Sequence, residues 1–222
     1  FRVREALALG ATRVLAVEPE ETLHRLIVDG VAGTTEPALR DARVELRERS
    51  PAELLARGGR EFDIIDIASD YLGQTDANKF AFTVEAVRSY YQALAPSGVI
   101  SIPVSIREFT VYAVKMIETV RQALAAEGVA APAQHLIVYR SSWNARILVA
   151  RQPFAVADIS RLRAFANRRS FDTSFYPGID PEKVEIWNDL PVVSLQQGTV
   201  MASEKATDAL MDDALRLLAN PD

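Results

Sequence analysis

The chain has 222 residues, of which 49% are apolar and 25% charged, a composition typical of one globular domain with or without an appendage. Its formal net charge of -5 argues against a protein that holds nucleic acid by neutralising phosphates, because that binding needs clustered Lys and Arg. The absence of cysteine excludes disulfides and thiolate chemistry, and the two histidines, His24 and His135, lie far apart. We therefore expect no metal. The sequence has no apolar run of about 20 residues, the length of a membrane-spanning helix.

Strand and helix signals alternate through the first half of the chain. The predicted elements are helices at residues 1–9, 20–28, 51–56 and 80–94, and strands at 14–17, 43–46, 62–67 and 99–104, with a turn at 96–98. This alternation predicts an α/β protein with a mostly parallel sheet and helices on both faces.

The second half departs from that alternation. The next predicted elements are a helix at 109–127, strands at 135–139 and 145–150, a helix at 155–168, a loop-rich stretch at 170–197 and a helix at 203–218. The linker 140–144 is too short for a crossover helix, so the two strands should form an antiparallel hairpin. This ending is typical of S-adenosylmethionine-dependent transferases and unlike nicotinamide dehydrogenases. We expect an α/β domain over 1–153 and a helical, loop-rich extension over 154–222 packing on it.

Glu18 closes the first predicted strand. In nucleotide-binding α/β folds, an acid at the end of the second strand accepts hydrogen bonds from ribose hydroxyls. The alternative is an ordinary acid beside Pro19 that caps the next helix. The order of the surrounding strands favours the ribose-binding role.

A polar loop follows the strand at 62–67. Ligands of open α/β sheets bind beyond the carboxyl ends of the strands, which makes Asp66, Ser69, Asp70 and Tyr71 candidates for the reaction centre. A carboxylate there could take a proton from an attacking amine or hold a cationic substrate. The alternatives are a solvated turn, for which Ser, Asp and Gly are also suited, and an Asp66 that points away from the cleft.

Ser50 is the third candidate, in the segment 48–51 that would border an adenine ring. Glu53 follows it by three residues, so the pair also fits a helix capping box. For Ser50 we favour this structural interpretation.

Several segments together resemble the bacterial spermidine synthase-like proteins, which share the class I S-adenosylmethionine-dependent methyltransferase fold. The matching segments are residues 10–18, 62–65, 82–86, 94–100, 151–154 and 170–178, within a region of about 1–188. The resemblance implies a Rossmann-like fold in which the chain opens with the helix after the glycine-rich turn. The first strand and the turn would then lie outside the chain, and the chain alone should bind its donor poorly.

The resemblance also implies a reaction. It predicts binding of S-adenosylmethionine or its decarboxylated form, with Glu18 on the ribose, Ser50 near the adenine, and Ser69 and Asp70 near an acceptor amine. Spermidine synthases carry Asp-x-x-Asp-Pro after the fourth strand. Here the first Asp falls on Ile67 or Ala68 and Tyr71 replaces the Pro, and a second family Asp falls on Ser50.

The sequence leaves three functions open. These are aminopropyl transfer in polyamine biosynthesis with Asp70 or Asp66 as base, methylation of a small molecule, and a degenerate nucleotide-binding or regulatory module without turnover. The expected partner is a small-molecule amine or another small acceptor, and a homodimer is left open. The resemblance further implies a cytoplasmic protein, or the cytoplasmic domain of a membrane protein.

Overall fold

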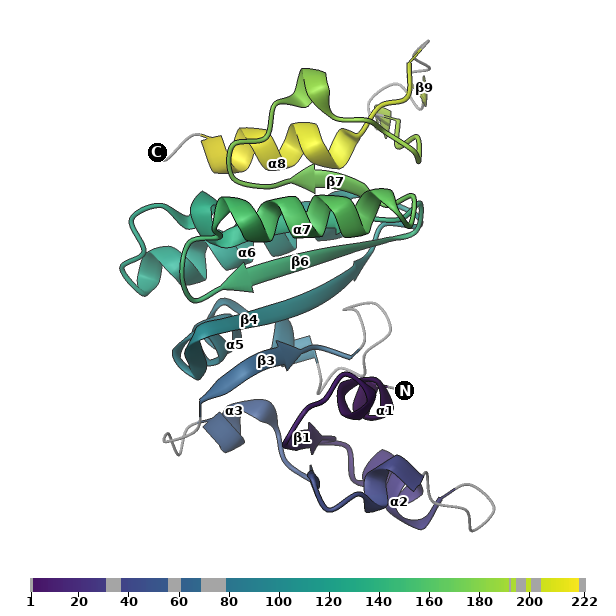
Figure 1. Cartoon of the computed structure of the whole chain (residues 1–222), viewed down its shortest axis with the longest axis vertical. Coiled ribbons are helices and arrows are strands. Elements are labelled where there is room, and N and C mark those ends of the chain that lie inside the picture. Colours follow the sequence, from purple (N-terminus) through teal and green to yellow (C-terminus); the bar gives the residue numbers. More distant parts are fainter. Residues whose placement is uncertain are drawn as a thin grey trace. The chain divides into compact units, whose positions relative to one another are not determined.

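The computed structural model describes residues 2–30, 37–55, 61–68, 79–191, 193–194, 199–200 and 205–219 (Figure 1). The chain divides into two compact units, one of Phe1–Gly59 with Gln74–Ala81 and one of Arg60–Gly73 with Phe82–Asp222. Both sides of the boundary expected after residue 153 lie in the second unit, and that boundary stays a prediction.

The first unit is built around two parallel strands. Its described elements are α1 (Arg2–Ala8), β1 (Val14–Val17), α2 (Glu21–Asp29), the 3-10 turn η1 (Pro37–Arg40), β2 (Val44–Arg47) and α3 (Pro51–Leu55). β1 pairs with β2 in parallel, with Val14 opposite Val44. After α1 the chain turns at Gly10, whose φ of 91° favours glycine. Helix α2 begins after Glu20, whose carboxylate accepts hydrogen bonds from two backbone N–H groups of the first turn.

The second unit is built on a five-stranded sheet in the order β3-β4-β6-β5-β7. Its strands are β3 (Phe62–Asp66), β4 (Leu94–Ser105), β5 (Leu136–Arg140), β6 (Asn144–Ala150) and β7 (Asp172–Phe175). β3 runs parallel to β4, and β6 runs antiparallel to both β4 and β5. The hairpin expected from the short linker is therefore confirmed. Because β6 is antiparallel to both β4 and β5, the strands β3, β4 and β5 share one direction. β7 pairs with β5 in the antiparallel direction.

Helices cover the sheet of the second unit. The remaining elements are η2 (Phe80–Phe82), α5 (Val84–Gln92), α6 (Val111–Ala126), η3 (Pro132–His135), α7 (Val156–Asn167), η4 (Pro181–Lys183), β8 (Val193–Ser194), β9 (Thr199–Val200) and α8 (Ala209–Ala219). α5 and α6 contact β4, whose alternate residues Ile100 and Ile102 are buried. α7 covers the sheet beside β6 (Figure 1). Its Ile159 belongs to a buried apolar cluster with Ile137 of β5 and Tyr176. These two layers form the core.

Two expectations about local structure are wrong. The turn expected at 96–98 lies inside β4, which starts at Leu94 and changes register against β3 between Phe62 and Ile64. Gly98 permits this irregular stretch, because a Cβ there would lie 2.6 Å from the Phe62 carbonyl oxygen. The stretch expected to be loop-rich contains β7, whose residues are all buried. Its sequence Asp-Thr-Ser-Phe is mostly polar and gives no alternating apolar signal.

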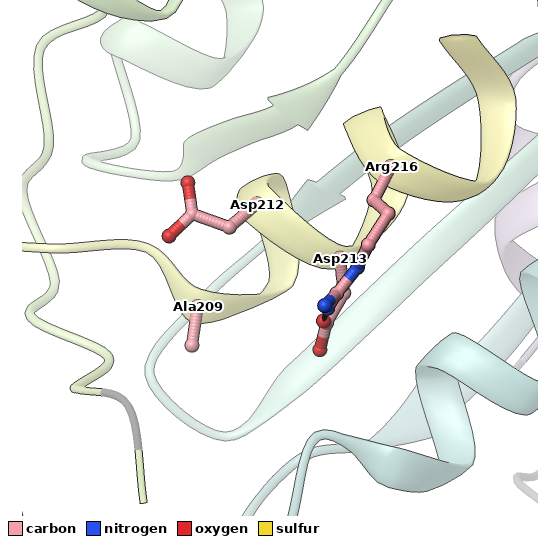
Figure 2. A pocket seen from close by; sticks show the side chains of 4 residues that line it. All are labelled: Ala209, Asp212, Asp213 and Arg216. Carbon is pink, nitrogen blue, oxygen red and sulfur yellow. Dashed lines mark hydrogen bonds and ion pairs between the residues drawn. The ribbon is translucent and has the colours of Figure 1, made fainter. Parts of the chain in front are cut away.

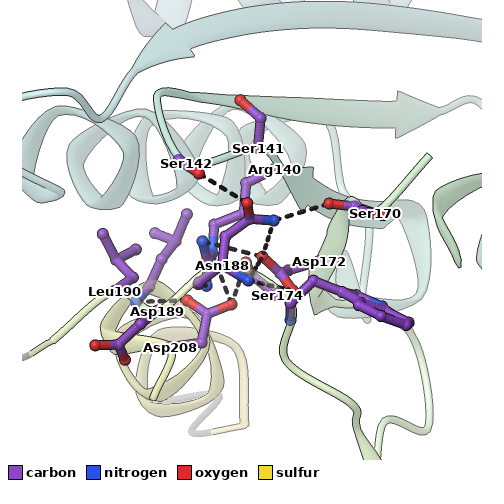
Figure 3. A network of polar contacts seen from close by, with 12 residues as sticks. Arg140, Ser141, Ser142, Ser170, Asp172, Ser174, Asn188, Asp189, Leu190 and Asp208 are labelled. Atoms are coloured by element: carbon purple, nitrogen blue, oxygen red, sulfur yellow. Dashed lines mark hydrogen bonds and ion pairs between the residues drawn. The ribbon is translucent and has the colours of Figure 1, made fainter. Parts of the chain in front are cut away.

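A buried polar network links the start of α8 to strands β5 and β7 of the sheet (Figure 3). Arg140, at the end of β5, donates through Nε to Asp208 Oδ2 over 2.9 Å and through NH2 to the Asn188 carbonyl over 2.7 Å. Its NH1 lies 3.2 Å from Asp172 Oδ2, an ion pair outside hydrogen-bond geometry. Ser174 donates to Asp208, and Asp172 accepts from Asn188. Two carboxylates thus offset the buried guanidinium, as burial of a charge requires.

Candidate functional site

Glu18 lies directly after β1, at the carboxyl end of the parallel pair. Its backbone N–H donates to the Arg47 carbonyl over 3.0 Å, and its carboxylate Oε1 accepts from the Glu20 N–H over 3.0 Å. Within the described part of the chain, Oε2 of Glu18 accepts no hydrogen bond. The local turn therefore fixes one oxygen of a partly buried carboxylate and leaves the other able to accept from a ligand.

A second acid lies at the carboxyl end of β2. Glu48 follows the strand, and its Oε2 lies 3.4 Å from Nδ1 of His24 on α2. Glu48 lies in the candidate segment 48–51, but its contact with His24 was not predictable, because nothing in the spacing of the two residues links a helix to the next strand. This part of the first unit thus presents two carboxylates, Glu18 and Glu48, after adjacent strands.

Ser50 is engaged at the start of α3. Its Oγ accepts a hydrogen bond from the Glu53 N–H over 3.2 Å, and Glu53 Oε2 accepts from the Ser50 N–H over 3.4 Å. The predicted capping box is therefore confirmed. A role for Ser50 in donor binding stays a prediction.

Asp66 is the last residue of β3, so it lies within the strand, in the second unit. Its Oδ1 accepts a hydrogen bond from NH1 of Arg146 over 2.9 Å, and the same NH1 lies 2.9 Å from Ser101 Oγ. Ser101 is the register partner of Asp66 on β4, and Arg146 is on β6. Three neighbouring strands thus each contribute one polar side chain to a cluster at the end of β3. Arg146 and Ser101 were not predictable as neighbours of Asp66, because only the pairing of the strands brings them together.

Ser69, Asp70 and Tyr71 lie outside the described residues, as does Asp76. Their roles in holding donor or acceptor stay predictions. Of the predicted site residues, the structure describes Glu18 and Ser50 in the first unit and Asp66 in the second.

One surface cavity, of about 390 Å³, lies on α8 (Figure 2). It is lined by Ala209, Asp212, Asp213 and Arg216. Burial raises the pKa of Asp212, as do the negative charges of Asp208 and Asp213, while Arg216 opposes the rise. Arg216 pairs with Asp213. Among the described residues, those that line this cavity all come from α8 and none from a strand end, whereas α/β folds bind their ligands at the carboxyl ends of strands.

Neither a metal centre nor a membrane span is found among the described residues. In those ranges, no three His, Cys, Asp or Glu side chains gather as metal ligands. No helix there is both long and apolar enough to cross a bilayer.

Comparison with solved structures identifies the fold. A spermidine synthase in complex with the transition-state analogue AdoDATO aligns with a TM-score of 0.50 and 18% identity, over 84% of this chain and 57% of that one. The spermidine synthase of Thermotoga maritima gives a TM-score of 0.50 and 19% identity over the same shares. A probable spermidine synthase of Corynebacterium glutamicum gives 0.50 and 17%, over 73% of this chain and 56% of that one.

The comparisons with sequences find no relative. No protein-family model matches this sequence, and no curated protein matches it. The chain spans little more than half the length of the spermidine synthases with which it aligns. At identities below 20%, the structural likeness concerns the fold. The chain therefore has the Rossmann-like α/β fold of the spermidine synthases, as expected from its sequence.

Proposed function

We propose that this protein is an S-adenosylmethionine-type group transferase that moves an aminopropyl group from decarboxylated S-adenosylmethionine to a small amine. The observation that carries the proposal is the carboxylate of Glu18 at the end of β1, with one oxygen fixed by the Glu20 N–H. In folds of this type, an acid at this position accepts hydrogen bonds from ribose hydroxyls. The shared fold with spermidine synthases supports the same class of donor.

The proposed reaction is a direct displacement. The lone pair of the acceptor amine forms a bond to the propyl carbon next to the sulfonium, and the carbon–sulfur bond breaks with its electron pair returning to sulfur. Methylthioadenosine leaves as a neutral thioether, and the amine gives up one proton. Because the sulfonium is already a good leaving group, the protein's task is to align nucleophile and donor.

Asp66 and Asp70 are the proposed acceptor-side carboxylates. Asp66 closes β3, and its Oδ1 is held by Arg146. A carboxylate fixed in this way can orient a protonated or neutral amine through a charge-assisted hydrogen bond, and it can receive the released proton. In this proposal the protein acts on small molecules, without a metal, in cytoplasmic polyamine biosynthesis.

Calorimetry and product analysis test the proposal. The full-length protein is titrated with decarboxylated S-adenosylmethionine, S-adenosylmethionine and methylthioadenosine, and then incubated with each donor and putrescine. We expect the decarboxylated donor to bind more tightly and to yield an aminopropylated product detected by mass spectrometry. If the protein binds S-adenosylmethionine more tightly and yields a methylated product, it is a methyltransferase and the proposed aminopropyl transfer is wrong. Binding without turnover would indicate a regulatory module, and no binding of any of the three would refute the transferase.

A further inference from the structure

The cluster at the end of β3 contains a cation, Arg146, that reaches Asp66 from two strands away. Arg146 is on β6, two strands away from β3, and its register partner on the intervening β4 is Pro103. Neighbouring strands lie about 4.8 Å apart, so the side chain must cross the whole of β4 to reach Asp66. It does so over Ser101, whose hydroxyl oxygen meets NH1 of Arg146 at 2.9 Å.

This arrangement has a desolvation cost, because it places two charged groups on the face of the sheet. The side chain of Arg146 is 17% exposed and that of Asp66 is 27% exposed, so the pair is partly withdrawn from water. Removing two charges from water opposes their attraction, and apolar residues of similar volume often stabilise a fold as well or better. Two residues further along β6, Leu148 lies on the same face of the sheet as Arg146. Its apolar side chain packs against the cluster that contains Ile159 of α7.

We propose that Arg146 is a positioning residue of the transferase, which holds the Asp66 carboxylate in the orientation that meets the acceptor amine. This inference rests on the proposed function. Arg146 fixes Oδ1 of Asp66 from one side, and Ser101 fixes the guanidinium group in turn. A held carboxylate loses no orientational freedom when the acceptor binds, whereas a displacement of about 1 Å at a reacting group can cost about 10²-fold in rate.

A matched ion pair provides the control. Arg88 on α5 donates through Nε to Glu127 Oε1 over 2.8 Å, at the end of α6. This pair belongs to the same unit and has a similar length, but it joins two helices and involves no residue at a strand end. Arg88→Met therefore removes a comparable ion pair without touching the proposed site.

The test compares Arg146→Met, Arg146→Lys, Ser101→Ala and Arg88→Met in the full-length protein. We expect Arg146→Met to lower kcat for transfer to putrescine about 10- to 100-fold, with the dissociation constant of the decarboxylated donor changed less than about 2-fold. Arg146→Lys should recover part of kcat, because lysine keeps the charge but not the planar donor group. Ser101→Ala should give a smaller loss of kcat, because it leaves the ion pair between Arg146 and Asp66 in place. Arg88→Met should leave kcat near the wild-type value.

The outcomes separate this inference from the function on which it rests. An active wild type whose Arg146→Met variant loses no more kcat than Arg88→Met overturns the positioning role alone, and so does a loss that Arg146→Lys does not reduce. A wild type that binds neither donor overturns the proposed function and, with it, the role of Arg146. If Arg146→Met unfolds, as judged by circular dichroism, Ser101→Ala decides: an unchanged kcat overturns the inference.

Discussion

Arg140 and Asp208 are 68 residues apart in the sequence, yet Nε of the arginine donates to Oδ2 of the aspartate over 2.9 Å in the buried interior of the second unit. The bond joins the end of β5 to the residue that precedes α8, where Asp208 Oδ1 also accepts from the Leu210 and Met211 N–H groups. One carboxylate thus neutralises a buried cation and caps a helix.

Replacing this carboxylate should destabilise the protein strongly. In Asp208→Asn, the side chain keeps its size and its capping ability, but Arg140 loses a counter-charge, and breaking a buried ion pair costs about 3–5 kcal/mol. Urea unfolding followed by circular dichroism measures the change. The surface pair Arg161 and Asp158 is the control, and Asp158→Asn should cost less than about 1 kcal/mol. If the two variants lose the same unfolding free energy, burial does not determine how much each ion pair contributes to stability.

Gly98 should resist substitution because of a close backbone approach. A Cβ at this position would lie 2.6 Å from the Phe62 carbonyl oxygen and 3.0 Å from that of Ala95. Gly98→Ala must therefore displace β3 from β4, at a cost of about 1–3 kcal/mol in unfolding free energy. Ser97→Ala, at the exposed preceding residue, should change the urea midpoint little. A Gly98→Ala protein as stable as Ser97→Ala would show that the strands accommodate the methyl group.

Tyr90 should make the protein sensitive to alkaline pH. Burial raises the pKa of its hydroxyl from 10.0 to about 12. The unfolded chain therefore loses this proton at lower pH than the folded chain, so the stabilisation is fully present below pH 10 and is lost as the pH rises toward 12. Urea unfolding between pH 9 and pH 12 should show a steeper loss of stability in the wild type than in Tyr90→Phe. If the unfolding free energies of the wild type and Tyr90→Phe fall equally with pH, the Tyr90 hydroxyl does not contribute to the alkaline loss of stability.

Glu18 should matter for donor binding and little for folding. Glu18→Gln removes the charge while keeping one amide oxygen for the Glu20 N–H, and losing a charged hydrogen bond of about 1.5–3 kcal/mol weakens donor affinity about 10- to 100-fold. Calorimetry with decarboxylated S-adenosylmethionine measures this loss. Glu20→Gln is the control, because Glu20 caps α2 through the Thr22 and Leu23 N–H groups. If both variants bind the donor as the wild type does, Glu18 is not its ribose ligand.

Asp66 should be needed for turnover more than for donor binding. Asp66→Asn removes the proposed general base and the charge that faces Arg146, and general bases contribute about 10²- to 10⁴-fold to rate. Single-turnover kinetics with a saturating donor isolates the transfer step. Asp63→Asn, on the same strand and exposed, should keep the wild-type rate. A normal rate in Asp66→Asn would leave Asp70 as the remaining predicted base.

The regular elements of this fold were predictable because their signals are local. The strand at 14–17 agrees with β1 residue for residue, since four consecutive apolar residues bounded by charged ones leave few alternatives. The β5–β6 hairpin followed from a linker too short to cross over. The Ser50 capping box was equally readable, because its two residues lie within one helical turn.

The features that escaped prediction depend on distant partners. β7 is a strand because β5 pairs with it and because Arg140 offsets its Asp172, and neither fact is visible in its polar sequence. Arg146 reaches Asp66 across 80 residues of chain, so no motif search around Asp66 could find it. Local sequence patterns thus predict the individual strands of the sheet. The ion pairs between residues on different strands become apparent only when the strand pairing is known.

The Arg140 network has a consequence for the order of folding during synthesis. Asp208, one of the two carboxylates that offset Arg140, follows it by 68 residues in the chain. A nascent chain that stops before residue 208 lacks this counter-charge, so burial of the arginine is less favourable in it than in the longer chain. The packing of β5 in the second unit therefore depends on the segment that leads into α8.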